Sequence, residues 1–143
     1  MSATVMLALS PRHCFLGAAR LQDHRLAFTR RSIRTGSGVA DMVADPGAEI
    51  WGALYELPEE EIGALDRKEG VGFAYARTDV RVHSVTGTAV DAVAYAVLAK
   101  EPTEIEPSLE YLQGILTAAV ERSLPADYLS SLRALLVRWH GLR

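Results

Sequence analysis

The chain has 143 residues, of which 49% are hydrophobic and 23% charged, so its composition suits one compact globular domain over residues 1–143. Fifteen Lys and Arg against 18 Asp and Glu give a net charge of −3, which argues against a nucleic-acid partner. The only cysteine is Cys14, no signal peptide pattern opens the chain and no apolar run could cross a bilayer, so we expect a cytoplasmic protein without a membrane partner.

The first third of the chain is predicted to hold a short helix and two strands. Residues 1–9 are apolar with helical spacing, and Ser10-Pro11 ends that segment. Residues 13–21 and residues 25–32 are typical of strands. A turn at residues 22–24 is expected to join the two strands.

Two further strands separated by a tight turn are predicted next. Residues 39–44 have the composition of a strand, and Asp45-Pro46-Gly47-Ala48 has the residue types of a tight turn. Residues 50–57 then alternate with a period of two through aromatic and apolar positions such as Trp51. That period indicates another strand.

A short helix with a sharp beginning and end is predicted after Leu57. Pro58 suits the first helical position, and Gly70 is the expected left-handed stop. Ile62 and Leu65 are expected to face the core. Glu69 would then lie in the last turn, where the negative end of the helix dipole raises the pKa of a carboxyl group. Acidic residues fill the first turn, where the dipole favours them: Glu59, Glu60 and Glu61.

The middle of the chain is predicted to form two more strands. Residues 73–85 place Tyr75 on one phase of a long strand, and Gly87 turns the chain. Residues 90–99 form a mostly apolar strand with Tyr95 in its middle.

Two helices are predicted to complete the chain. Ser108 caps a helix over residues 109–122, and Leu124-Pro125 separates it from a helix over residues 126–140. Their buried stripes are expected to contain Leu112, Ile115, Leu116 and Ala119 in the first, and Leu129, Leu132, Leu135 and Leu136 in the second. Strands followed by helices indicate an α+β fold. The four His residues show no metal-ligand spacing, so no metal site is expected.

The residues around the short acidic helix resemble the gamma-glutamylcyclotransferase-like family. The family pattern is a P-G, a V/I-W-G strand, an acidic helix, L-D-x-x-E-G and a Tyr. This chain matches it with Pro46-Gly47, Ile50-Trp51-Gly52, Leu65-Asp66, Glu69-Gly70 and Tyr75. Pro107-Ser108 and Tyr111 match the family's P-S-x-x-Y-L element.

The resemblance implies a site and a fold. Glu69 would be the catalytic acid/base, and Tyr75, Tyr95 and Tyr111 would line the substrate pocket. Apart from the resemblance, Asp66 is expected to order the end of the helix and not to take part in the chemistry. The fold would be a small mixed β-barrel, made by a curved sheet, with flanking helices.

The reaction that the resemblance implies is the cyclisation of a gamma-glutamyl amine or gamma-glutamyl amino acid by an acyltransferase or lyase. The substrate carries its own amine nucleophile, so one carboxylate that moves a proton is sufficient. The products would be 5-oxoproline and a free amine. No metal or cofactor is required, and the partner would be the small-molecule gamma-glutamyl substrate.

Family members open with a strand and a Y-G-S-N loop that hold the glutamyl group, and this sequence has no such loop. We expect either a start codon placed too late or a naturally shortened member, with weak or no turnover by the 143-residue form. Two alternatives therefore stay open. One is an inactive small-molecule binder. The other is an interaction protein, for instance a homodimer, that pairs an exposed strand edge.

Overall fold

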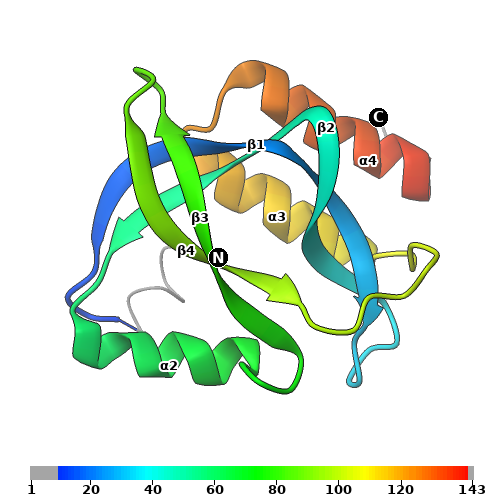
Figure 1. Ribbon diagram of the computed structural model, residues 1–143. Helices are drawn as coiled ribbons and strands as arrows, with labels where there is room; N and C mark the ends of the chain where they lie inside the picture. Colours follow the sequence, from blue (N-terminus) through cyan, green and yellow to red (C-terminus); the bar gives the residue numbers. More distant parts are fainter. Residues whose placement is uncertain (1–9, 142–143) are drawn as a thin grey trace.

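The computed structural model describes residues 10–141, which form a curved four-stranded antiparallel sheet and three helices (Figure 1). The strands are β1 (Cys14–Arg31), β2 (Gly38–Glu56), β3 (Tyr75–Ser84) and β4 (Ala89–Val97), and the helices are α2 (Glu59–Glu69), α3 (Leu109–Glu121) and α4 (Ala126–His140). The predicted α+β class is confirmed. The helix expected over residues 1–9 lies outside the described residues.

The sheet has the spatial order β2-β1-β3-β4, and each of its three ladders is antiparallel. The resemblance implied a sheet with both parallel and antiparallel pairs, but these four strands pair only in the antiparallel sense. The sheet curves until its edge strands β2 and β4 come into contact. Asp41 of β2 accepts a hydrogen bond from the backbone N–H of Val97 at the end of β4 (2.9 Å). The two edges are thus joined through a buried side chain.

The first two strands are longer than the sequence pattern predicted. Four separate strands were expected over residues 13–57, with turns at residues 22–24 and 45–48, and this prediction is wrong. Both predicted turns lie opposite each other inside one long β1–β2 ladder, where the register shifts between Gln22 and His24. Asp23 adopts a φ of 60°, and its carboxylate accepts a hydrogen bond from Gly47 N–H (3.0 Å). The turn-forming residues are absorbed as a bulge, which bends the strand pair without ending it.

The β3–β4 hairpin is shorter than predicted at its open end. Phe73 lies in the turn before β3 with 71% of its surface exposed, and β4 ends at Val97. The pairing places Arg77 directly opposite Tyr95.

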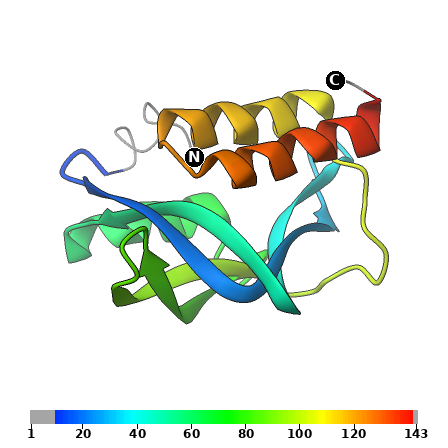
Figure 2. The ribbon, with the colours of Figure 1, turned by 90° about the horizontal axis from the view of Figure 1, so that it is seen from above.

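Helices α3 and α4 pack side by side on one face of the curved sheet, and α2 lies on the opposite side (Figure 2). The side chain of Ser108 accepts a hydrogen bond from Tyr111 N–H, which confirms the predicted cap of α3. The core between the sheet and the helices is centred on four buried residues: Ala18, Ala119, Leu124 and Leu132. The predicted leucines Leu116, Leu129 and Leu135 pack around them.

Candidate active site

An open cavity of about 1190 Å³ lies between α2, the end of β2 and the β3–β4 hairpin. Apolar side chains from every one of these elements line it, including Leu54, Ile62 and Val80. The four residues predicted to form the site also line it: Glu69, Tyr75, Tyr95 and Tyr111. The fold therefore brings together residues from two helices and two strands that lie up to 42 positions apart in the sequence.

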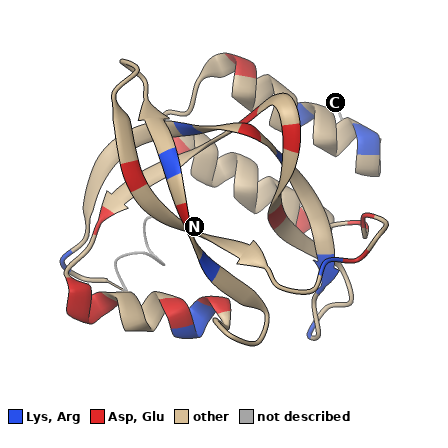
Figure 3. Cartoon of the chain, viewed as in Figure 1, with Lys and Arg blue, Asp and Glu red and all other residues tan. Residues whose placement is uncertain are grey.

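Helix α2 is anchored at its first turn. Pro58 precedes it in an extended conformation and supplies no side-chain cap. The Glu61 carboxylate instead accepts hydrogen bonds from Ser10 Oγ (2.5 Å) and from Arg12 Nε (2.6 Å), and Glu60 accepts from Arg12 Nη2 (2.5 Å). Figure 3 shows this acidic first turn. The anchor fixes the start of the helix whose other end carries Glu69.

The end of α2 fixes the position of Glu69. Gly70 adopts the predicted left-handed conformation, with φ 64° and ψ 48°. Its N–H donates to Arg67 C=O, and Val71 N–H donates to Asp66 C=O. The Gly70 carbonyl then accepts the N–H groups of Ala74 (2.7 Å) and Tyr75 (3.3 Å). One compact turn therefore joins the carboxylate at the end of α2 to the first tyrosine of β3.

The side chain of Glu69 is half-buried, and within residues 10–141 its carboxylate accepts no hydrogen bond. Burial raises the pKa of Glu69, and the neighbouring Lys68 ammonium offsets part of that rise. The direction of this pKa shift is the predicted one, and its largest cause is desolvation. A carboxyl group whose pKa is raised by desolvation holds its proton to higher pH than an exposed Glu, which suits a group that accepts and releases a proton.

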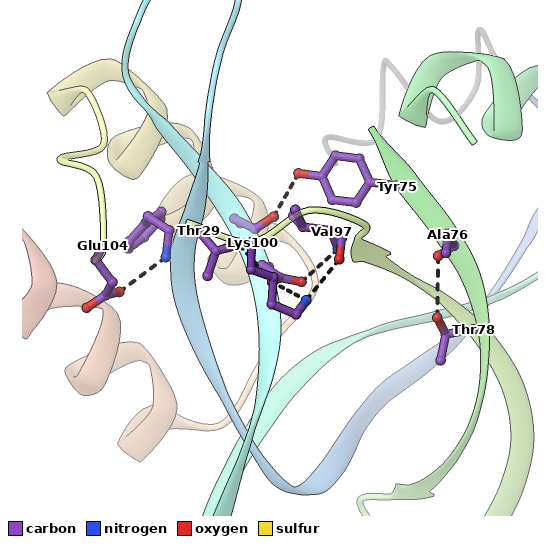
Figure 4. A network of polar contacts seen from close by, with 10 residues as sticks. Thr29, Tyr75, Ala76, Thr78, Val97, Lys100 and Glu104 are labelled. Atoms are coloured by element: carbon purple, nitrogen blue, oxygen red, sulfur yellow. Dashed lines mark hydrogen bonds and ion pairs between the residues drawn. The ribbon is translucent and has the colours of Figure 1, made fainter. Parts of the chain in front are cut away.

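Tyr75 and Tyr111 bind the same peptide unit of β2. The Tyr75 hydroxyl donates to the carbonyl of Ala40 (2.8 Å), a bond drawn in Figure 4, and the Tyr111 hydroxyl accepts from the N–H of Ala40 (3.0 Å). Burial raises the pKa of both phenols, and the negative charge of Glu69 raises it further. Both hydroxyls therefore stay protonated at neutral pH.

A residue of α2, Asp66, positions the side chain of Tyr95. Its hydroxyl donates to Asp66 Oδ1 (2.7 Å), and the same carboxylate forms an ion pair with Arg77. The Arg77 hydrogen bond, followed by that of Tyr95, lowers the pKa of Asp66 and keeps it ionised. Burial raises the pKa of Tyr95, and the hydrogen bond to Asp66 adds to the rise. Asp66 thus orders the helix end through its carbonyl, as predicted, and also holds a cavity tyrosine.

The profile of the AIG2-like family matches residues 49–132 of this chain, which is more than half of it. This chain belongs to the AIG2-like, or gamma-glutamylcyclotransferase, family. The mouse and human gamma-glutamylcyclotransferases are each 30% identical to it over 131 residues, which cover 88% of this chain and 69% of theirs. The solved structure of a gamma-glutamyl cyclotransferase superimposes with a TM-score of 0.85 at 28% identity, over 93% of this chain and 80% of that one.

One polar residue behind the site of this AIG2-like protein, Asp41, was not predicted from the sequence. The buried carboxylate of Asp41 accepts from Thr29 Oγ1 (2.7 Å) and from Lys100 Nζ (2.6 Å), in addition to Val97 N–H (Figure 4). Asp41 directly follows Ala40, the residue that binds two of the tyrosines. An acid in the middle of an otherwise apolar strand was the signal that could have identified it.

Two further properties concern the described part of this AIG2-like protein. Residues 10–141 contain no group of three His, Cys, Asp or Glu side chains placed to hold a metal ion. Over the same range no helix is both long enough and apolar enough to span a bilayer.

Proposed function

We propose that this protein cyclises a gamma-glutamyl amine or gamma-glutamyl amino acid and releases 5-oxoproline, with Glu69 as the general acid/base. The observation that carries the proposal is the half-buried carboxylate of Glu69, without a hydrogen-bond partner among residues 10–141, in a cavity lined by Tyr75, Tyr95 and Tyr111. Membership of a family whose curated relatives include gamma-glutamylcyclotransferases supports the same reaction.

The chemistry is a transfer within one molecule. The α-amine of the glutamyl group attacks its own γ-carbonyl carbon, so a C–N bond forms in a five-membered ring and the original amide C–N bond breaks. Glu69 takes a proton from the attacking nitrogen and delivers it to the leaving nitrogen, which departs as a free amine. No atom enters from water, and the cavity supplies the bent geometry that brings the amine to the carbonyl.

The direct test is the release of 5-oxoproline from a panel of gamma-glutamyl amino acids and gamma-glutamyl amines by the purified chain. The panel is followed for hours, because weak turnover is enough to decide the question. Product formation from at least one member supports the proposal. Absence of product from every member, at protein concentrations that would reveal a slow reaction, refutes it.

A second function is binding without turnover, which the tyrosines and the apolar walls of the cavity also favour. A ligand-induced rise in melting temperature without product would support this alternative. Homodimer formation and a cytoplasmic location stay predictions. Sedimentation over a range of concentrations tests the first, and fractionation of cells tests the second.

A further inference from the structure

The hydroxyl groups in the cavity differ in what they can offer a ligand. Tyr75 donates its proton to the Ala40 carbonyl, so only its oxygen lone pairs are left for the cavity. Tyr111 binds the same peptide in the opposite sense, since it accepts from the Ala40 N–H. Its own proton has no acceptor among the described residues. Within residues 10–141 nothing therefore competes with a ligand for the proton of Tyr111.

Like Tyr75, Tyr95 has already donated its hydroxyl proton to a protein acceptor. Its proton is given to the Asp66 carboxylate, which Arg77 keeps ionised and which can therefore only accept. Of the hydroxyls of Tyr75, Tyr95 and Tyr111, two present lone pairs and one presents a proton. Glu69, when ionised, adds a further acceptor.

A gamma-glutamyl substrate has the complementary pattern. Its α-amine and its leaving amide nitrogen carry N–H donors, and its γ-carbonyl oxygen is the acceptor on which negative charge develops as the ring closes. Resting on the proposed function, we propose that Tyr111 donates its hydroxyl proton in a hydrogen bond to this carbonyl oxygen, and that Tyr75 and Tyr95 accept from the substrate's nitrogens. Tyr111 would then stabilise the oxyanion without losing its proton.

The surroundings of Tyr111 fit this role. Its position is fixed at both ends, since its backbone N–H donates to the Ser108 cap and its hydroxyl oxygen accepts from Ala40 N–H. Burial and the nearby carboxylate of Glu69 raise its pKa, so the proton is present throughout the neutral range. A donor held in advance costs no reorganisation when charge appears.

The test compares Tyr111→Phe with Tyr75→Phe, because each variant removes one hydroxyl from the same Ala40 peptide. Loss of a preorganised oxyanion donor typically lowers kcat by about 10²–10³-fold. We expect that loss in Tyr111→Phe with little change in KM, whereas Tyr75→Phe should mainly raise KM. Equal losses of kcat in the two variants would overturn the assignment and indicate a shared structural role.

A second measurement does not need turnover. The infrared band of 5-oxoproline, labelled with ¹³C at the ring carbonyl, should move to lower frequency when it binds the wild type and Tyr75→Phe, but not when it binds Tyr111→Phe. If wild type makes no 5-oxoproline yet shows this pattern, the donor assignment holds while the proposed reaction fails. If turnover is present and the band is the same in both variants, the assignment is wrong and the reaction stands.

Discussion

Replacement of Asp41 by Ala should be among the most destabilising changes in the sheet. The carboxylate is buried, and its removal leaves the buried Val97 N–H without an acceptor, at a cost of about 1–3 kcal/mol. The Thr29 hydroxyl loses its partner as well. Lys100 is 41% exposed in its side chain, so its share of the ion pair is about 1 kcal/mol or less. We expect the free energy of unfolding to fall by about 2–5 kcal/mol, mostly from the Val97 N–H and the Thr29 hydroxyl that lose their acceptor.

Urea unfolding of three variants tests this reasoning. Asp41→Asn keeps an acceptor for Val97 N–H but not the charge for Lys100, so it should lose about half as much as Asp41→Ala. Asp91→Ala is the matched control. Asp91 pairs with Arg81 on the surface, where both side chains are at least 67% exposed, so the cost should be below about 1 kcal/mol. A loss in Asp41→Ala no larger than in Asp91→Ala would refute the role assigned to the buried carboxylate.

Three further predictions follow from α2 and Glu69. Gly70→Ala should lower the free energy of unfolding by about 1–2 kcal/mol, because alanine is strained at φ 64°. Gly114→Ala should raise it by about 0.5–1 kcal/mol, because an added Cβ meets open space there and alanine favours a helix. Urea unfolding measures both changes. Burial raises the pKa of Glu69 above its value in the unfolded chain, so the stability of the wild type falls as pH rises between those two pKa values. Glu69→Gln should therefore be at least as stable as the wild type at pH 7, and this advantage should vanish below about pH 4. Melting curves across pH will check both expectations. For the same reason the acid limb of kcat/KM should have its midpoint above the ordinary Glu pKa of about 4.3, and a midpoint at or below that value would contradict a buried base.

The helices were predictable because their signals are local. Ser108 caps α3 with its own hydroxyl, α4 spans the predicted residues, and Gly70 ends α2 in the expected conformation. The length of β1 and β2 was not predictable from local patterns. Asp23 and Gly47 are turn-forming residues when each is considered alone, and only their position opposite each other in the ladder converts two turns into one bulge.

In the site, too, some features were predictable from the sequence and others depend on contacts between distant residues. The resemblance identified Glu69 and the three tyrosines, and the structure places all four at one cavity, while their catalytic and binding roles stay predictions. The polar partners were not predictable. The peptide of Ala40 has no side-chain signal, and Asp41 accepts a hydrogen bond from Lys100, which lies 59 residues away. These contacts decide which hydroxyl can donate, so the chemistry of the cavity depends on packing that sequence patterns do not contain.

The central claim is that Glu69 carries the proton in a cyclisation. The most direct measurement is the rate of 5-oxoproline release by wild type, Glu69→Gln and Glu59→Gln on the best substrate of the panel. Glu59→Gln makes the same chemical change at the exposed first turn of the same helix. We predict that Glu59→Gln keeps the wild-type rate and that Glu69→Gln loses about 10²–10⁴-fold while it remains folded. A Glu69→Gln rate close to that of wild type would show that the proton carrier lies elsewhere.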